Sequence, residues 1–183
     1  KQPDIKQIYC VEIVPEQIEL AKKNILKYDL NDKIKPLLGS LFEPIQRNFS
    51  TIKADVIIDD CSGLSPVAKE LGWYPEGDKI PLGGIDGTEK VVPFLEQAGK
   101  YLAEGGTVYF PTTPNFSDED KIIEVARKHF SKIELVLEKK LPLTQYHREV
   151  ISKTNSSHVF EPIIEMGSRG FWTAKIWKVR DPI

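Results

Sequence analysis

Short apolar runs alternate with amphipathic stretches along the first half of the chain. Residues 5–12 and 54–60 form two such runs, and the first suits a strand buried on both faces, as in a parallel sheet. Residues 15–29 carry apolar side chains at spacings of three and four, which predicts a helix with one buried face. The short run at 34–38 contains Pro36, which favours an edge strand, and the glycine and proline that bracket 39–44 predict a loop there.

The alternation continues beyond the middle of the chain. A helical stripe of apolar residues covers 91–102, and the run at 107–110 predicts the next strand. Ser117 with Asp120 three residues later resembles a capping box, which places a helix at 118–130.

The tail differs from the rest in its longer apolar and aromatic runs. Strands are expected at 133–141 and 171–179, and the polar stretch 144–170 between them is interpreted as either a lid or a flexible loop. The whole order of strands and helices is that of an α/β fold. Sheets of this kind bind ligands beyond the C-terminal ends of their strands.

Composition narrows the class of protein. The chain has 183 residues, 40% of them hydrophobic, which is the size and content of one domain, so we expect residues 1–183 to form a single domain. The net charge of −2 gives no support for nucleic-acid binding. With no apolar run near the roughly 20 residues that cross a bilayer, and no secretory signal, we expect a cytoplasmic protein without membrane contact.

The two cysteines limit the chemistry that the chain could carry. Cys10 and Cys61 have neither the number nor the spacing of a disulfide framework or a zinc site, so no metal is expected.

Residues 63–87 are rich in glycine and proline and contain Trp73 and Tyr74. Ordered loops of this length are usually functional, so this segment is the expected substrate loop.

Four stretches in order resemble the HemK-like class I S-adenosylmethionine-dependent methyltransferases: VEIVPE at 11–16, GSLFEP at 39–44, DVIIDD at 55–60 and LGGIDG at 82–87. This resemblance implies S-adenosyl-L-methionine as the cofactor. It also implies a Rossmann-like sheet, mostly parallel with an antiparallel C-terminal strand.

The resemblance assigns roles to residues at the ends of the strands. Glu12 matches the acid that accepts hydrogen bonds from the ribose of the cofactor, with Ile13 beside it. Ser40 stands where the family commonly has an aspartate beside the adenine, and Leu41 supplies an apolar wall. Asp59, at the end of its strand, is also expected to bind the cofactor.

The catalytic motif of the family is altered in this chain. Where HemK-like enzymes carry Asn-Pro-Pro-Tyr, this sequence has Asp60, Cys61, Ser62 and Gly63. Asp60 keeps a hydrogen-bond acceptor, so it is expected both to contact the cofactor and to be the catalytic residue. Cys61 and Ser62, with Trp73 and Tyr74, are expected to bind the substrate.

A second departure concerns the N-terminus. The glycine-rich loop that follows the first strand in these enzymes has no counterpart, because no glycine precedes Gly39. The first strand and helix of the family are therefore expected to be missing from this chain.

The sequence therefore predicts a methyltransferase that N-methylates a protein or small-molecule acceptor. Because the motif is altered, the alternative is a non-catalytic methyltransferase-like binding module. A nucleotide-dependent oxidoreductase is disfavoured, since no Tyr-x-x-x-Lys relay lies near the site. The identity of the acceptor and the oligomeric state stay open.

Overall fold

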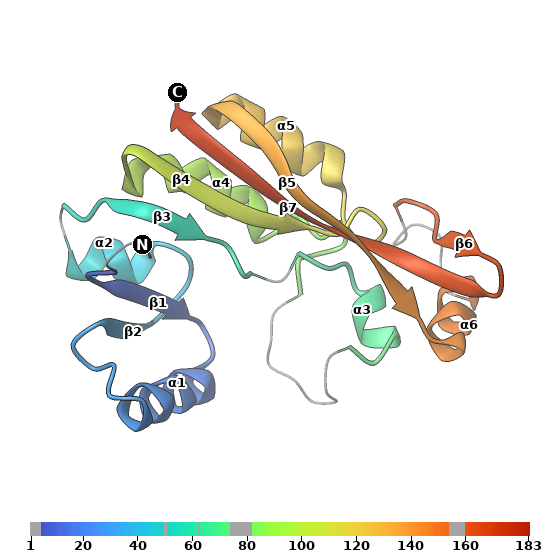
Figure 1. Cartoon of the computed structure of the whole chain (residues 1–183), viewed down its shortest axis with the longest axis horizontal. Helices are drawn as coiled ribbons and strands as arrows, with labels where there is room; N and C mark the ends of the chain where they lie inside the picture. Colours follow the sequence, from blue (N-terminus) through green and yellow to red (C-terminus); the bar gives the residue numbers. More distant parts are fainter. Residues whose placement is uncertain (1–4, 50, 62, 74–81, 154–159) are drawn as a thin grey trace. The chain divides into compact units, whose positions relative to one another are not determined.

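The chain divides into two compact units, Lys1–Ile52 and Lys53–Ile183 (Figure 1). The computed structural model describes residues 5–49, 51–61, 63–73, 82–153 and 160–183. No described helix is long and apolar enough to cross a membrane.

The first unit consists of two strands and two helices: β1 (Ile8–Glu12), α1 (Pro15–Lys27), β2 (Ile34–Leu38) and α2 (Glu43–Asn48). β1 and β2 pair in parallel, with Glu12 opposite Leu38. Pro15 opens α1, where its missing N–H is not needed, and Ile18 and Ile25 are buried on one face of the helix. These elements and the edge position of β2 confirm the prediction.

Two details of the first unit differ from the prediction. The segment 39–44 was expected to be a loop, but α2 begins at Glu43, because Pro44 is tolerated in a first helical turn. β1 is not buried on both faces: Ile8 and Cys10 are exposed. The physical reason is that α1 packs more against β2 than against β1, so it covers little of β1.

The second unit is a five-stranded sheet with helices. Its elements are β3 (Ala54–Ile58), α3 (Val67–Glu70), α4 (Val91–Ala98), a 3₁₀ turn (Gly99–Tyr101), β4 (Leu102–Thr112), α5 (Glu119–His129), β5 (Phe130–Leu143), α6 (Gln145–Lys153), β6 (Ile164–Met166) and β7 (Arg169–Pro182). The strand order is β3-β4-β7-β5, and β6 pairs with β7. β3 runs parallel to β4, whereas β7 is antiparallel to both β4 and β5.

This topology fixes where a site can lie in the second unit. Because β7 opposes both of its neighbours, β3, β4 and β5 all point the same way and end at the same edge of the sheet. The arrangement confirms the predicted mixed sheet with an antiparallel C-terminal strand. It also confirms the two strands expected in the tail.

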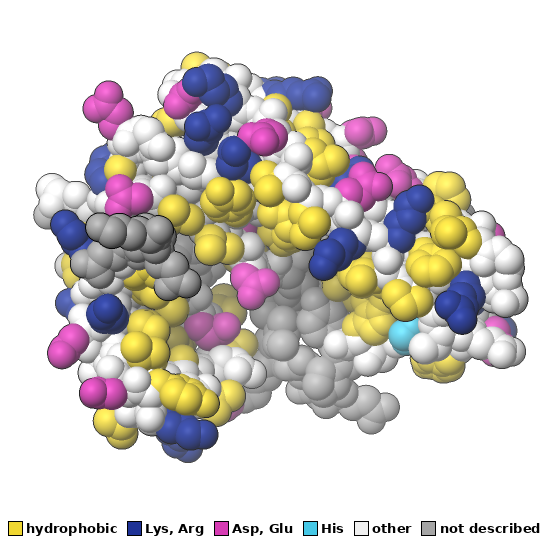
Figure 2. Space-filling model, viewed as in Figure 1, with side chains coloured by type: hydrophobic (Ala, Val, Ile, Leu, Met, Phe, Trp, Pro, Cys, Tyr) yellow, Lys and Arg dark blue, Asp and Glu magenta, His cyan; other side chains and the backbone are white. Residues whose placement is uncertain are grey.

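The two faces of this sheet are covered unequally. Val108 and Phe110 of β4 are fully buried on the face that carries α4 and α5 (Figure 1). On the opposite face, Val56 and Ile58 of β3 are 54% and 71% exposed. Figure 2 shows hydrophobic side chains gathered over this sheet. One edge of β3 is likewise unpaired by the strands that the structure describes.

Three boundaries in the second unit were predicted wrongly. β4 begins at Leu102, which was expected to be helical, because Leu102 pairs with Ala54 of β3 ahead of a register shift, after which the regular pairing begins at Val56 and Thr107. The cap of α5 is Asp118 rather than Ser117, since the Asp118 carboxylate accepts the backbone N–H of Lys121 at 3.0 Å. The polar stretch 144–170 contains α6 and β6 rather than only a loop.

Candidate active site

Glu12 lies at the C-terminal end of β1, beside the turn that follows β2. Its backbone carbonyl accepts the N–H of Gly39 at 2.9 Å. One carboxylate oxygen, Oε1, accepts the backbone N–H of Val14 at 2.8 Å, which holds the half-buried side chain at the start of α1. No described residue hydrogen-bonds the other oxygen, Oε2, so this carboxylate keeps an acceptor for a ligand hydroxyl.

The neighbouring candidates share this edge of the first unit. Ser40 follows Gly39 directly, and its carbonyl accepts the N–H of Glu43 as the chain turns into α2. Leu41 has a φ of 47°, a left-handed backbone conformation that residues other than glycine rarely adopt. Strain of this kind is concentrated at binding sites. The structure therefore brings Glu12, Ile13, Ser40 and Leu41 to the C-terminal edge of the same two-stranded sheet.

Asp59 and Asp60 follow β3 in the second unit and have opposite environments. Asp59 is 4% exposed, whereas Asp60 is exposed, as expected for adjacent residues of a strand. The N–H of Asp59 donates to the Tyr109 carbonyl at 2.8 Å, and its Oδ1 accepts the N–H of Cys61 at 2.8 Å. Burial raises the pKa of Asp59, and the charge of Asp60 adds to this, although hydrogen bonds from Cys61 oppose the shift.

Three loop segments interlock behind Asp60. The N–H of Gly83 donates to the Leu64 carbonyl at 3.0 Å, and the N–H of Ser65 donates to the Phe116 carbonyl at 2.9 Å. Gly87 lies so close to Gly63 that a Cβ on Gly87 would meet the Gly63 carbonyl oxygen. The segments 63–65, 83–88 and 113–118 thus hold the chain that leaves β3.

Asp86 ties the middle loop to α5. Its carboxylate accepts the backbone N–H and the hydroxyl of Thr88 and the ammonium of Lys121, the last at 2.7 Å. Burial raises the pKa of Asp86, but the hydrogen bonds from Lys121 and Thr88 outweigh it and leave the pKa below its usual value. Asp86 and Gly87 were not predicted as site residues, although their LGGIDG segment was among the four that carried the resemblance.

Trp73 is part of a packed cluster rather than an open loop. Its ring meets Phe116 edge-on with centroids 5.0 Å apart, and it lies 5.2 Å from the Trp172 ring. Trp73 also meets His147 of α6 edge-on at 5.8 Å. Of the other expected substrate residues, Cys61 is partly exposed at the end of β3, while Ser62 and Tyr74 lie outside the described residues.

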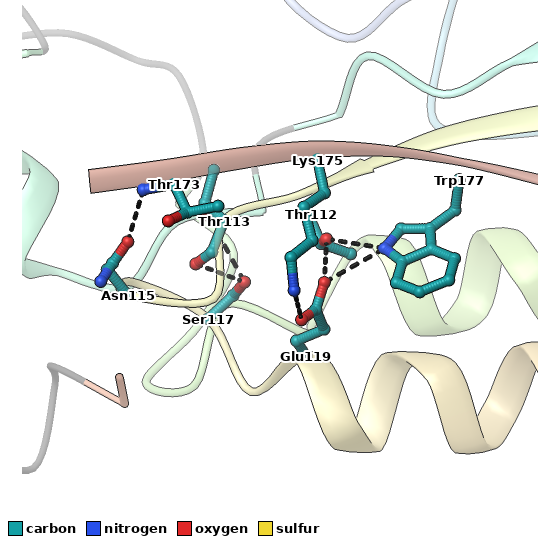
Figure 3. A network of polar contacts seen from close by, with 8 residues as sticks. All are labelled: Thr112, Thr113, Asn115, Ser117, Glu119, Thr173, Lys175 and Trp177. Atoms are coloured by element: carbon teal, nitrogen blue, oxygen red, sulfur yellow. Dashed lines mark hydrogen bonds and ion pairs between the residues drawn. The ribbon is translucent and has the colours of Figure 1, made fainter. Parts of the chain in front are cut away.

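A polar network anchors α5 to β7 just beyond the C-terminal end of β4 (Figure 3). The Lys175 ammonium lies 2.6 Å from the Glu119 carboxylate, and these side chains are only 17% and 12% exposed. Trp177 Nε1 donates to Thr112 Oγ1 at 3.0 Å and to Glu119 at 3.1 Å. Burial lowers the pKa of Lys175, but its pairing with Glu119 outweighs this and raises it.

Asn115 anchors a second part of the same loop. It is buried, and its Oδ1 accepts the backbone N–H of Thr173 at 2.6 Å (Figure 3). Its amide nitrogen donates to the carbonyls of Glu161 and Pro162. Among the described residues, no group of three or more His, Cys, Asp or Glu side chains could hold a metal ion.

Comparisons with known proteins bear on the fold and the resemblance. Residues 3–66 match the family model described as RNA cap guanine-N2 methyltransferase. The chain is 24% identical over 132 residues to a release factor glutamine methyltransferase of Thermosynechococcus vestitus, covering 70% of this chain and 45% of that protein. It is 27% identical over 108 residues to the enzyme of the same name from Aquifex aeolicus, covering 55% of this chain and 36% of that protein.

Solved structures match over most of the chain. A precorrin-6y C5,15-methyltransferase from Geobacter metallireducens has a TM-score of 0.50 and 9% identity, covering 95% of this chain and 68% of that chain. A putative methyltransferase complexed with SAH also has a TM-score of 0.50, with 13% identity, and is matched over 92% of this chain and 39% of its own.

These matches confirm the Rossmann-like fold and the predicted resemblance to S-adenosylmethionine-dependent methyltransferases. The chain spans less than half the length of the two curated relatives it matches.

Proposed function

We propose that this chain carries the methyltransferase domain of an S-adenosylmethionine-dependent enzyme that methylates a nitrogen atom. The observation that supports it most directly is Glu12, whose half-buried carboxylate stands at the end of β1 beside the 39–41 turn with one oxygen held and the other available. A carboxylate is an acceptor for both hydroxyls of a ribose ring. When bound, the cofactor supplies a methyl group on a positively charged sulfur.

The residues of the first unit fit the nucleoside half of that cofactor. Glu12 would hold the ribose, Ser40 would offer a hydroxyl to the adenine edge, and Leu41 with Ile13 would give the ring an apolar surface. Ile13 is exposed, as a residue that contacts a ligand can be. The glycine-rich loop expected for the methionine half has no counterpart in this sequence, so no residue is assigned to it.

Asp60 is the proposed acceptor-side residue. Its exposed carboxylate can accept an N–H of the substrate, orient the nitrogen lone pair and take the proton released when the nitrogen–carbon bond forms and the sulfur–carbon bond breaks. Most of the rate enhancement would come from the alignment of the two reactants. The loops that interlock behind Asp60 give it a fixed place on the second unit.

The named relatives suggest the kind of nitrogen. The amide of glutamine and the N2 amine of guanine are both planar N–H groups on an sp² carbon, and Asp60 could accept a hydrogen bond from either. We propose a protein or small-molecule acceptor, because the net charge of −2 does not favour a polyanion. A methyl-transfer assay with protein and small-molecule acceptors should include RNA oligonucleotides for comparison.

Calorimetry tests the proposal on the full-length protein. Titration with S-adenosylmethionine should give saturable heat, and Glu12→Ala should weaken binding about tenfold or more, the loss expected for a charge-assisted hydrogen-bond acceptor. Glu19→Ala is the matched control, because Glu19 is an exposed acid of the same unit that pairs with Lys22. No heat with the wild-type protein would favour a non-catalytic module, and undiminished binding by Glu12→Ala would remove the ribose assignment.

A further inference from the structure

Asp59 is buried yet incompletely hydrogen-bonded. Its Oδ1 accepts the Cys61 N–H, but its Oδ2 is buried and has no hydrogen-bond partner within the described ranges. A buried carboxylate normally has partners for both oxygens, and leaving one without a donor costs free energy. Because Asp59 directly precedes the proposed catalytic Asp60, we expect a function that accounts for this free-energy cost.

Asp59 forms a turn with the two residues that follow it. The hydrogen bond between the Asp59 N–H and the Tyr109 carbonyl continues the β3–β4 ladder one residue beyond Ile58. The bond from the Cys61 N–H to the Asp59 side chain then spans two residues, which is an Asx turn. This turn bends the chain immediately after Asp60 and leaves the Asp60 side chain exposed.

We infer that Asp59 is a positioning residue: its buried side chain holds the Cys61 N–H and thereby sets the direction in which Asp60 meets the acceptor. This inference rests on the proposed function of Asp60. It gives Asp59 a role in addition to the cofactor contact expected from the sequence.

Burial also disfavours the charged form of the Asp59 carboxyl group. Loss of hydration raises the pKa of Asp59, and the neighbouring charge of Asp60 raises it further. Oδ1 is an acceptor for the Cys61 N–H whether or not the carboxyl group carries a proton on its other oxygen. Asparagine offers the same acceptor without a charge, whereas alanine offers none.

Paired variants separate the turn from the carboxyl group. Asp59→Asn should retain most of kcat, whereas Asp59→Ala should lower kcat by up to about 100-fold, the loss expected from misplacing a reacting group by about 1 Å. The affinity for S-adenosylmethionine should stay within about twofold in both variants, because other residues are proposed to make the ribose and adenine contacts. Equal losses of kcat in the two variants, or full kcat in Asp59→Ala, would overturn the positioning role.

A second readout does not depend on catalysis. In a Cys10→Ser background, the alkylation rate of the Cys61 thiol reports how firmly the turn is held. It should be faster in Asp59→Ala than in Asp59→Asn; comparing these two removes the effect of the lost charge, which they share. Asp60→Asn is the matched control, because it removes a neighbouring negative charge but leaves the turn, so its thiol rate gives the effect of charge alone.

The combined results distinguish the two ideas. If wild type binds no S-adenosylmethionine, the proposed function fails, while the thiol rates still test the turn. If methyl transfer is present but the thiol rates of Asp59→Ala and Asp59→Asn agree, the proposed function stands and the positioning role is wrong. Circular dichroism melting of both variants shows whether Asp59→Ala is folded at the assay temperature.

Discussion

A Cβ atom on Gly87 would lie 2.7 Å from the carbonyl oxygen of Gly63, and 2.5 Å from the Cβ of Ser117. Neither neighbour is the far end of a flexible side chain, so neither can move away easily. Gly87 also has a φ of 72°. The LGGIDG segment therefore needs a glycine at this place for two reasons, its backbone conformation and its approach to the chain that leaves β3.

We expect Gly87→Ala to destabilise the protein by about 3 kcal/mol, the sum of the left-handed backbone cost and of overpacking. Gly105→Ala is the matched control, because Gly105 has the same φ of 72° but open space around it. Only the backbone cost, about 1 kcal/mol, applies there. Urea unfolding of both variants measures the difference, and equal losses would show that the contact with Gly63 is unimportant.

The mostly buried Glu119–Lys175 pair should matter more to stability than an exposed pair on the same helix. Lys175→Met leaves the mostly buried Glu119 carboxylate without its cation, which should cost roughly 2 kcal/mol, less than for a fully buried pair. Lys128→Met is the control: Lys128 pairs with Glu124 on α5 at 2.6 Å, but both side chains are more than 60% exposed, so little change is expected. Similar thermal unfolding midpoints for the two variants would contradict this ranking.

Asp59 should make stability depend on pH. Its folded pKa lies above the unfolded value of 3.8, so the folded state binds the proton more tightly. Its contribution to stability is therefore complete below pH 3.8 and is lost as the pH rises through the raised, folded pKa. Asp59→Asn lacks this titration. The free energy of unfolding of Asp59→Asn relative to that of wild type should therefore increase as the pH rises above 3.8, and should level off above the folded pKa. Chemical unfolding at several pH values measures this difference. A difference that does not depend on pH would refute the prediction.

Asp60 should separate turnover from cofactor binding. Because its exposed carboxylate is proposed to orient and deprotonate the acceptor, Asp60→Ala should lower kcat by about 100-fold or more. The affinity for S-adenosylmethionine measured by calorimetry should be retained. Asp55→Asn, a change at an exposed acid of β3, the strand that precedes Asp60, should leave both quantities unchanged. Normal turnover by Asp60→Ala would exclude the residue from the reaction.

Leu41 should trade stability against binding. Leu41→Gly relieves the left-handed strain at a φ of 47°, so the stability lost with the side chain should be partly offset. Cofactor affinity should fall, since the proposed apolar wall for the adenine is removed. Calorimetry and urea unfolding of the same variant test both parts, and unchanged affinity would contradict the adenine assignment.

The sequence by itself determined those features that depend on neighbouring residues. The spacing of Ile18 and Ile25 predicts α1, and the β-branched run Val56–Ile58 predicts β3, because periodicity and propensity act within a few residues. The acid at position 12 followed by Pro15 likewise indicated the end of a strand and the start of a helix. The order of these elements then predicted the α/β class and the edge of the sheet at which a site is proposed.

Only the tertiary structure decided the rest, because it depends on residues far apart in the chain. The pairing of Ala54 with Leu102 starts β4 at a residue whose spacing predicted a helix, ahead of two glycines. Pairing with β4 decided that Asp59 is buried, and packing against Phe116 and Trp172 placed Trp73 in an aromatic cluster. Such contacts depend on which surfaces meet in space, and no local pattern of side chains encodes that.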